Sequence, residues 1–276
     1  RIELNRRIAG ILRDELQDNQ GAFEAVKSAL RIDLSDEALR HDFETLAISL
    51  GNPQAIIELY ETGIADVDDD VLKHEIYRRM ASVYEEELHD TDKAIQAYRA
   101  MIELDDMDKS SLNALEVLYT NTQNWEELLD ILKRKADIGT GDEKVDILRK
   151  MATINCDCLN HPKAAIDNYC EILDNLPDDT DALDALESLY VQIEDWKSLC
   201  ENYGIKLQLA TDDENRRVIL KKMADIQENK LHSVDDSIDI YVQVLDIFPE
   251  DVETLDALDR LYLERESYDE LSDILQ

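Results

Sequence analysis

The sequence has few of the residues that interrupt helices. Only 7 glycines and 4 prolines occur among 276 residues, and aromatic residues make up 6%. This scarcity is expected of an all-helical chain. Apolar residues account for 44% of the sequence, which is enough to build a continuous core.

Cysteine and histidine are also sparse, and their placement argues against a metal or redox site. The cysteines are Cys156, Cys158, Cys170 and Cys200, and they show neither disulfide-framework spacing nor a CxxC motif. Cys200 aligns with Leu129 of the preceding repeat, so we interpret the cysteines as inert thiols. His89, His161 and His232 stand about one repeat apart, so we expect them to contact preceding helix ends. We therefore expect no cofactor.

Long apolar runs are missing as well. No segment is apolar over the length needed to cross a bilayer. No signal peptide is visible, although a missing N-terminus would hide one. Together with the free thiols, this slightly favours the cytoplasm while leaving the compartment open.

Basic residues are few compared with acidic ones. The 29 Lys and Arg residues face 65 Asp and Glu residues, which gives a net charge of −36. Binding to nucleic acid or to an anionic membrane is therefore disfavoured. A basic partner, a high-salt habitat or simple solubility would each fit. Many carboxylates stand where helices are expected to begin, as in Asp178-Asp179, and there they cap backbone N–H groups.

The strongest positive feature is a repeated element. Arg78-Arg79-Met80-Ala81 returns after 71 and 72 residues as Arg149-Lys150-Met151-Ala152 and Lys221-Lys222-Met223-Ala224, with a weaker copy at Arg6-Arg7-Ile8-Ala9. A fixed period of this kind predicts a repeat architecture. We expect one array over residues 1–276, with modules at approximately 1–66, 67–138, 139–210 and 211–276. The pattern runs to both ends without polar capping repeats, so we interpret the chain as a segment of a longer protein.

Each module is predicted to hold two helical hairpins. In the first type, small residues recur where the two helices must approach closely: Ala9, Ala81, Ala152 and Ala224 on the first helix, and Ala22, Ala94, Ala165 and Ser237 on the second. The second type begins at 112–119 and returns at 183–190 and 255–262. Its second helix opens with an aromatic residue, namely Trp125, Trp196 or Tyr268.

These positions resemble the tetratricopeptide repeat family. In the first hairpin type Tyr77, Met80, Ala81, Tyr84, Ala94 and Tyr98 fall on the family pattern, with about one residue added in the turn. The second type is a looser match, because Leu115, Tyr119, Leu128 and Leu132 fit but Glu116 replaces a small residue. The long pairing of hairpins is also similar to repeat arrays of some environmental bacteria.

The resemblance implies an all-α, right-handed superhelical solenoid of antiparallel helix pairs, with eight hairpins and about sixteen helices. It also implies a scaffold that binds a protein or peptide through its concave face. We find no catalytic constellation and do not expect an enzyme. Two alternatives stay open. The chain could sequester a basic client through its acidic surface, or serve as a structural spacer or array that associates end to end.

A basic residue that recurs once in each module is the candidate binding feature. The basic ladder consists of Arg6, Arg78, Arg149 and Lys221, each two residues before the Met or Ile of the repeated element. The resemblance implies that this position lines the concave groove, like part of a carboxylate clamp. The Asn or Arg that a clamp needs one turn later is replaced by Gly10, Ser82, Thr153 and Asp225, so we do not predict binding of chaperone C-termini. Alternatively, these bases form ordinary surface ion pairs. Arg79, Lys150 and Lys222 point away from the ladder and are expected to be solvated.

Overall fold

The computed structural model describes residues 1–265 and shows an all-α helical repeat solenoid. Fifteen α-helices and no β-strand lie in this range, as the sequence predicts. The expected sixteenth helix, which would carry Tyr268 and Leu271, lies outside the described residues. Contacts divide the chain into two units, Arg1–Ile138 and Gly139–Gln276. The division falls at the predicted boundary between the second and third modules. The number and limits of the modules stay a prediction, as does the superhelical handedness.

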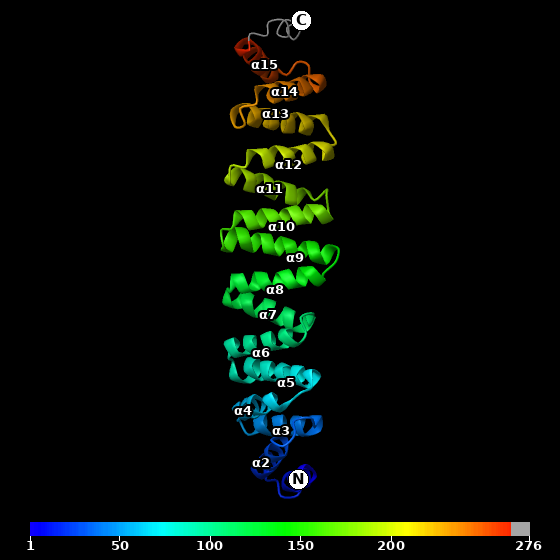
Figure 1. Ribbon diagram of the computed structural model, residues 1–276, viewed down its shortest axis with the longest axis vertical. Helices are drawn as coiled ribbons and strands as arrows, with labels where there is room; N and C mark the ends of the chain where they lie inside the picture. Colours follow the sequence, from blue (N-terminus) through cyan, green and yellow to red (C-terminus); the bar gives the residue numbers. More distant parts are fainter. Residues whose placement is uncertain (266–276) are drawn as a thin grey trace. The chain divides into compact units, whose positions relative to one another are not determined.

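Unit 1 contains eight α-helices that follow one another in chain order (Figure 1). They are α1 (Ile2–Asp14), α2 (Asn19–Leu30), α3 (Glu37–Ser49), α4 (Gln54–Gly63), α5 (Asp70–Val83), α6 (Thr91–Leu104), α7 (Lys109–Thr122) and α8 (Trp125–Ile138). A short 3-10 helix at Ile64–Asp66 follows α4. Neighbouring helices in the chain are neighbours in space, as expected of a repeat protein.

Unit 2 continues the same pattern with seven described α-helices (Figure 1). They are α9 (Asp142–Thr153), α10 (Pro162–Asn175), α11 (Thr180–Gln192), α12 (Trp196–Leu209), α13 (Asp213–Asn229), α14 (Val234–Ile247) and α15 (Val252–Glu264). Here too each helix packs on the next one along the chain.

The small residues of the first hairpin type lie where the sequence places them. Ala81 on α5 and Ala94 on α6 are both fully buried, and so are Ala152 and Ala165 in the corresponding hairpin of unit 2. A methyl group at the crossing lets two helices approach closely, because a larger side chain would hold their backbones apart. The first-type hairpins accordingly make the most extensive helix–helix contacts in the described residues.

Aspartates at helix starts account for part of the acidic excess. In nine of the fifteen described α-helices the N-cap is an Asp whose carboxylate accepts a hydrogen bond from a backbone N–H of the first turn. Each such carboxylate satisfies an N–H group that has no partner inside the helix and lies at the positive end of the helix dipole. The capping role that the sequence predicts is therefore confirmed.

Within residues 1–265, the turn inside each of seven hairpins has one residue in the left-handed region of φ. In the first type these residues are Gln17, His89, Asn160 and His232, and in the second type they are Gly51, Gln123 and Glu194. His89 also fulfils the expected contact with a helix end, because its Nδ1 lies 3.0 Å from the carbonyl oxygen of Glu85.

The residue added to the first hairpin type is accommodated in a wider helical turn. A single π-helical turn follows α5 at Tyr84–Leu88, and another follows α9 at Ile154–Cys158. A π turn takes up one more residue than an α turn without breaking the helix. The repeat therefore departs from the usual family length without losing its packing register.

Candidate functional site

The basic ladder lies on the first helix of each module, and most of its charges are engaged within the chain. Arg149 on α9 donates to the carboxylate of Asp179 at 2.6 Å. Lys221 on α13 contacts Asp251 at 3.1 Å, and Arg6 on α1 contacts Asp36. Each acceptor is the N-cap of the third helix of its module, thirty residues further along the chain. The base therefore joins the first hairpin of a module to the second.

The capping aspartates of unit 2 are held as carboxylates. Burial alone would raise the pKa of Asp179, but the backbone N–H of Ala182 and the side chain of Arg149 lower it below its ordinary value. The pKa of Asp251 is lowered in the same way, against its burial, by hydrogen bonds from Thr254 and Lys221. These contacts support the structural interpretation of the ladder, and binding through the ladder stays a prediction.

Arg78 is the exception within the ladder. Its guanidinium lies 3.2 Å from Nδ1 of His74, and Nε2 of His74 lies 2.9 Å from the carboxylate of Asp108. The histidine thus stands between the base and the N-cap of α7, which the other ladder bases reach directly. Arg78 is exposed and forms no ion pair with the residues that the structure describes.

A second row of bases, one residue after the ladder, is not simply solvated as the sequence suggested. Arg79 Nε donates to Glu44 at 2.8 Å, and Lys222 Nζ donates to Glu187 at 2.9 Å. Lys222 is exposed as expected but is also paired, whereas Arg79 is only partly exposed. A step of one residue turns a side chain by about 100° around the helix, so the second row faces the preceding hairpin instead of the following one.

Glu187 shows how these carboxylates are held. It accepts hydrogen bonds from Lys206 on the next helix, from Lys222 and from the hydroxyl of Tyr203, the last at 2.8 Å. Burial works against the charge, but these donors lower the pKa of Glu187 to about 2. In unit 1 the equivalent Glu116 is bound by Lys135. A glutamate can therefore replace the small residue of the family pattern, because its carboxylate finds a donor on the partner helix.

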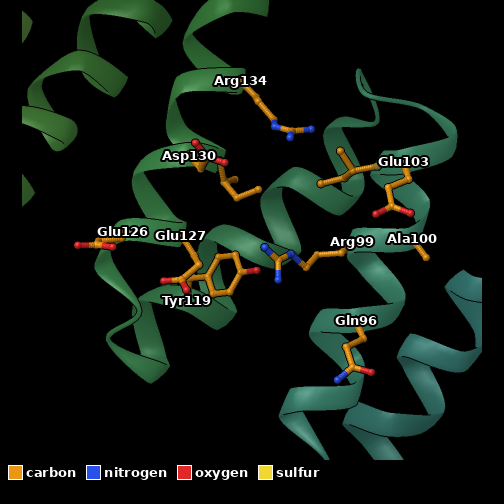
Figure 2. A pocket seen from close by; sticks show the side chains of 11 residues that line it. Gln96, Arg99, Ala100, Glu103, Tyr119, Glu126, Glu127, Asp130 and Arg134 are labelled. Carbon is orange, nitrogen blue, oxygen red and sulfur yellow. The ribbon is translucent and has the colours of Figure 1, made fainter.

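A cavity lies in unit 1, between α6 and α8. We call it the α6–α8 cavity; it has a volume of about 620 Å³. Its lining is Gln96, Arg99, Ala100, Ile102 and Glu103 from α6, Tyr119 from α7, and Glu126, Glu127, Asp130, Ile131 and Arg134 from α8. Figure 2 shows Arg99 and Arg134 reaching into the space from its two walls. The cavity is lined mainly by second helices of hairpins, whereas the ladder lies on first helices.

Three hydrogen-bond donors in this cavity have no acceptor among the described residues; Arg99 and Arg134 are exposed, and Tyr119 is buried. Neither Arg99 nor Arg134 forms an ion pair with any residue in the range 1–265. The hydroxyl of Tyr119 is buried and has no hydrogen-bond partner, and the whole residue is 3% exposed. Burial raises the pKa of Tyr119, an effect that Arg99 opposes and Glu127 and Asp130 reinforce. The phenol therefore stays protonated and keeps a proton to donate.

Sequence reasoning missed this cavity, although a signal was present. At the positions that correspond to Arg99 and Arg134, the next module has Cys170 and Ile205. Arg134 departs from the repeat, and Arg99 departs from the next module, although Lys27 keeps a base at this position one module earlier. The ladder was found because it follows the repeat. In a repeat protein, packing recurs by necessity, so a residue that breaks the pattern is the better indicator of a local role.

Other chemistry has little support in the described part of the chain. Among residues 1–265, no three His, Cys, Asp or Glu side chains are grouped so that they could hold a metal ion. All four cysteines are free, and burial raises the thiol pKa of Cys156 and of Cys200. Across the same range no helix combines the length and the apolar character that a membrane span requires.

Comparison with known families identifies the repeat. A tetratricopeptide repeat model matches residues 111–145, which include most of α7 and all of α8, and residues 182–217, which include most of α11 and all of α12. These two segments of the chain are therefore tetratricopeptide repeats. The match reverses our ranking of the two hairpin types, because both matched segments are of the second type. Proteins of this family are in general non-catalytic scaffolds for protein–protein interaction.

Several solved structures resemble the chain at low identity. One is a tetratricopeptide repeat protein from Parabacteroides merdae, with 16% identity, a TM-score of 0.35, and coverage of 95% of this chain and 98% of that one. Another is the TPR2AB domain of yeast Sti1 in a complex with pHSP90, with 13% identity, a TM-score of 0.32, and coverage of 95% and 97%. A third is YrrB, described as having an unusual peptide-binding site, with 15% identity, a TM-score of 0.33, and coverage of 72% and 96%. No curated protein matches the chain.

Proposed function

We propose that this chain is a non-catalytic scaffold that binds a segment of another protein through the α6–α8 side of unit 1. The observation that carries the proposal is the cavity with unused donors. Elsewhere, the ladder bases Arg149 and Lys221 are paired with capping aspartates. Arg99 and Arg134 keep their hydrogen-bonding capacity, although the chain has more than twice as many acidic as basic residues.

The basic ladder is a second candidate surface for the same function. On this hypothesis a partner would lie along the first helices, in the groove that the family resemblance implies. Arg78 is the ladder member best suited to contact it, because its guanidinium is exposed and meets only His74 among the described residues. A partner of Arg149 would have to compete with Asp179, which that arginine already contacts at 2.6 Å.

Affinity capture from the native extract tests which surface acts. The immobilised wild type is compared with a cavity variant, Arg99→Glu with Arg134→Glu, and a ladder variant, Arg78→Glu with Arg149→Glu, at low and high salt. We expect a protein that wild type and the ladder variant retain at both salts and the cavity variant loses. Circular dichroism confirms that each variant is folded.

The other outcomes decide between the alternatives. Loss only in the ladder variant would move the function to the ladder. Retention by all three proteins at low salt only would favour a basic client held by the acidic surface, since salt screens exposed charges. If no protein is retained specifically under any condition, the scaffold proposal is refuted.

The outer face of α1 favours end-to-end association as a second candidate function. Leu4, Ile8 and Ile11 share one side of α1 and are exposed, with Leu4 at 62%. The corresponding residues on α5 are Ile76, Met80 and Val83, and all are buried in unit 1, where α4 packs against α5. The α1 face therefore has the chemistry of a surface that receives another helix of this repeat, whether from a second copy of the chain or from an earlier repeat of a longer protein.

Sedimentation velocity over a range of concentrations tests this association. We expect wild type to form larger species as concentration rises, and the Leu4→Glu variant to stay monomeric. Val71→Glu is the control, because Val71 is exposed on α5 and lies outside the α1 face. A wild type that stays monomeric at the highest concentration rules out this mode of assembly.

A further inference from the structure

Arg99, Arg134 and Tyr119 of the α6–α8 cavity do not satisfy one another in the structure. A guanidinium has five N–H donors and no acceptor, so Arg99 and Arg134 cannot accept a hydrogen bond from any neighbour. The buried hydroxyl of Tyr119 has a proton to donate and no acceptor within the described residues. Leaving a buried polar group unpaired costs free energy, so the site is incomplete as it stands. The proton of Tyr119 lacks an acceptor, because neither arginine can provide one.

The next module shows how the same position is completed when no ligand is needed. Tyr190 corresponds to Tyr119, and its hydroxyl lies 3.7 Å from Sγ of Cys170. Cys170 occupies the place that Arg99 has in unit 1. A thiol can both give and accept a weak hydrogen bond, whereas an arginine can only donate. With Cys170 at this position, the tyrosine hydroxyl has a partner inside the chain. With Arg99 there instead, the neighbour of Tyr119 can only donate.

We propose that the α6–α8 cavity binds the carboxylate of an Asp or Glu residue in a partner segment that also carries a basic residue. This rests on the proposed scaffold function and names the chemistry that the scaffold recognises. A carboxylate has two oxygens, so one can accept from the exposed Arg99 guanidinium, while the other accepts from Tyr119 once the ligand displaces the side chains that cover its buried hydroxyl. Arg134 enters from the opposite wall and neutralises the remaining charge (Figure 2). Hydrogen bonds of this charge-assisted kind are stronger than neutral ones.

The acidic residues that line the cavity favour a ligand that carries a basic residue beside its carboxylate. Glu103, Glu126, Glu127 and Asp130 all line the cavity, so it has four negative groups against two positive ones. A free inorganic anion would be repelled by these acidic residues. A peptide segment that places a Lys or Arg beside its own carboxylate satisfies both charges. Ile102 and Ile131 are buried at the same site and offer apolar contact to the rest of the segment.

The acidic residues of the cavity could also pair with the two arginines and so compete with a ligand carboxylate. Glu103 lies one turn after Arg99 on α6, and Asp130 lies one turn before Arg134 on α8, so each arginine has an acid at i±4. Pairs of this spacing stabilise a helix only slightly, and neither pair is formed in the structure. A ligand carboxylate that also satisfies the buried Tyr119 hydroxyl gains a bond that neither intrahelical pair can offer.

Two terminally blocked peptides test the proposal on the full chain. The probes are acetyl-Lys-Leu-Glu-Leu-Lys-amide and its counterpart with Gln in place of Glu, and calorimetry measures their affinities. We expect the Glu peptide to bind roughly tenfold more tightly, as a hydrogen bond to a charged group allows. Bulk attraction to a chain of charge −36 works in the opposite direction, because the Gln peptide is the more positive. The preference therefore reports the cavity and not the acidic surface.

Variants locate the binding. Arg99→Gln should remove the preference for Glu, and Tyr119→Phe should weaken the Glu peptide about three- to tenfold. Lys27→Gln is the matched control, because Lys27 holds the position of Arg99 one module earlier and its loss changes the net charge equally. With tyrosine ¹³Cζ labels, the resonance that disappears in Tyr119→Phe should shift when the Glu peptide is added.

Each result either supports or refutes carboxylate recognition by the α6–α8 cavity. Equal affinity for the two peptides, or no binding up to millimolar concentration, refutes carboxylate recognition; specific capture that depends on Arg99 and Arg134 would still uphold the scaffold function. An equal loss in Lys27→Gln and Arg99→Gln also refutes it, because the effect would then be one of net charge. A Glu preference that Arg99→Gln abolishes and Lys27→Gln preserves supports it.

Discussion

Replacing Glu187 by Gln tests whether the carboxylates between hairpins stabilise unit 2. The side chain is 23% exposed and accepts hydrogen bonds from Lys206, Lys222 and Tyr203. Gln has nearly the same shape and keeps one acceptor oxygen, but it removes the counter-charge of Lys222 and one of the two carboxylates that pair with Lys206. The variant should therefore unfold more easily than wild type while keeping the same fold.

The magnitude follows from the pKa of Glu187. A lowering from 4.5 to about 2 corresponds to roughly 3 kcal/mol of preference for the charged form. Water still reaches the side chain and screens the interaction, so we expect a loss of about 2 kcal/mol. Asp184→Asn is the control. Asp184 contacts the same Lys206 but is 74% exposed, and its loss should cost less than about 0.5 kcal/mol.

Fluorescence of Trp196 provides a local assay. Trp196 begins α12, the helix that carries Lys206, and the chain has only two tryptophans. A Trp125→Phe background therefore makes Trp196 the sole reporter of urea unfolding in unit 2. A Glu187→Gln variant as stable as wild type, or a loss no larger than that of Asp184→Asn, would refute the reasoning.

The pH dependence gives a second check on Glu187. Its pKa is lower in the folded chain than the ordinary value of 4.5, so the folded state favours the charged form. The stabilisation is therefore fully present above the ordinary pKa and is lost as pH falls toward about 2. The stability difference between wild type and Glu187→Gln should be constant near neutral pH and shrink between pH 4.5 and pH 2. A difference that grows on acidification contradicts the assigned contacts.

Three further predictions concern single side chains. Tyr119→Phe removes an unpaired buried hydroxyl and should leave stability unchanged or raise it by about 1 kcal/mol, whereas Tyr203→Phe loses a bond to a carboxylate and should cost about 1–2 kcal/mol. Urea unfolding compares them, and equal losses would contradict the difference. Asp179→Ala should cost about 1–2 kcal/mol of thermal stability and Asp179→Asn about half as much, since Asn still caps the helix. Burial raises the pKa of the Cys156 thiol, so iodoacetamide at pH 7 should alkylate exposed Cys158 first, as peptide mass spectrometry would show; faster alkylation of Cys156 would overturn that assignment.

Local pattern was enough to predict the helices and their hairpins. Ala81 and Ala94 were assigned to a helix crossing from their recurrence, and both are fully buried. The aspartates placed before helix starts, such as Asp179, do cap them. Such features are readable from sequence because each repeat contacts only its neighbours, so nearby residues hold most of the information.

The partners of the charged side chains could not be read in the same way. Lys221 and Lys222 are adjacent in the sequence, yet Lys221 contacts Asp251 ahead of it and Lys222 contacts Glu187 behind it. With 65 acidic residues, every base has many potential partners, and composition does not choose among them. The rotation of about 100° per residue around the helix makes the choice, and it takes effect only when the neighbouring hairpins are packed.

The sequence alone determined the period, the helical hairpins, the small residues at their crossings and the excess of acid. The packed structure decided that most ladder bases are held by helix-capping aspartates and that the unused donors gather around Tyr119 instead. The physical reason is the range of the interactions. Helix formation and hairpin packing depend on residues a few turns apart, whereas a pairing such as Arg149 with Asp179 joins side chains thirty residues apart across the interface between two hairpins.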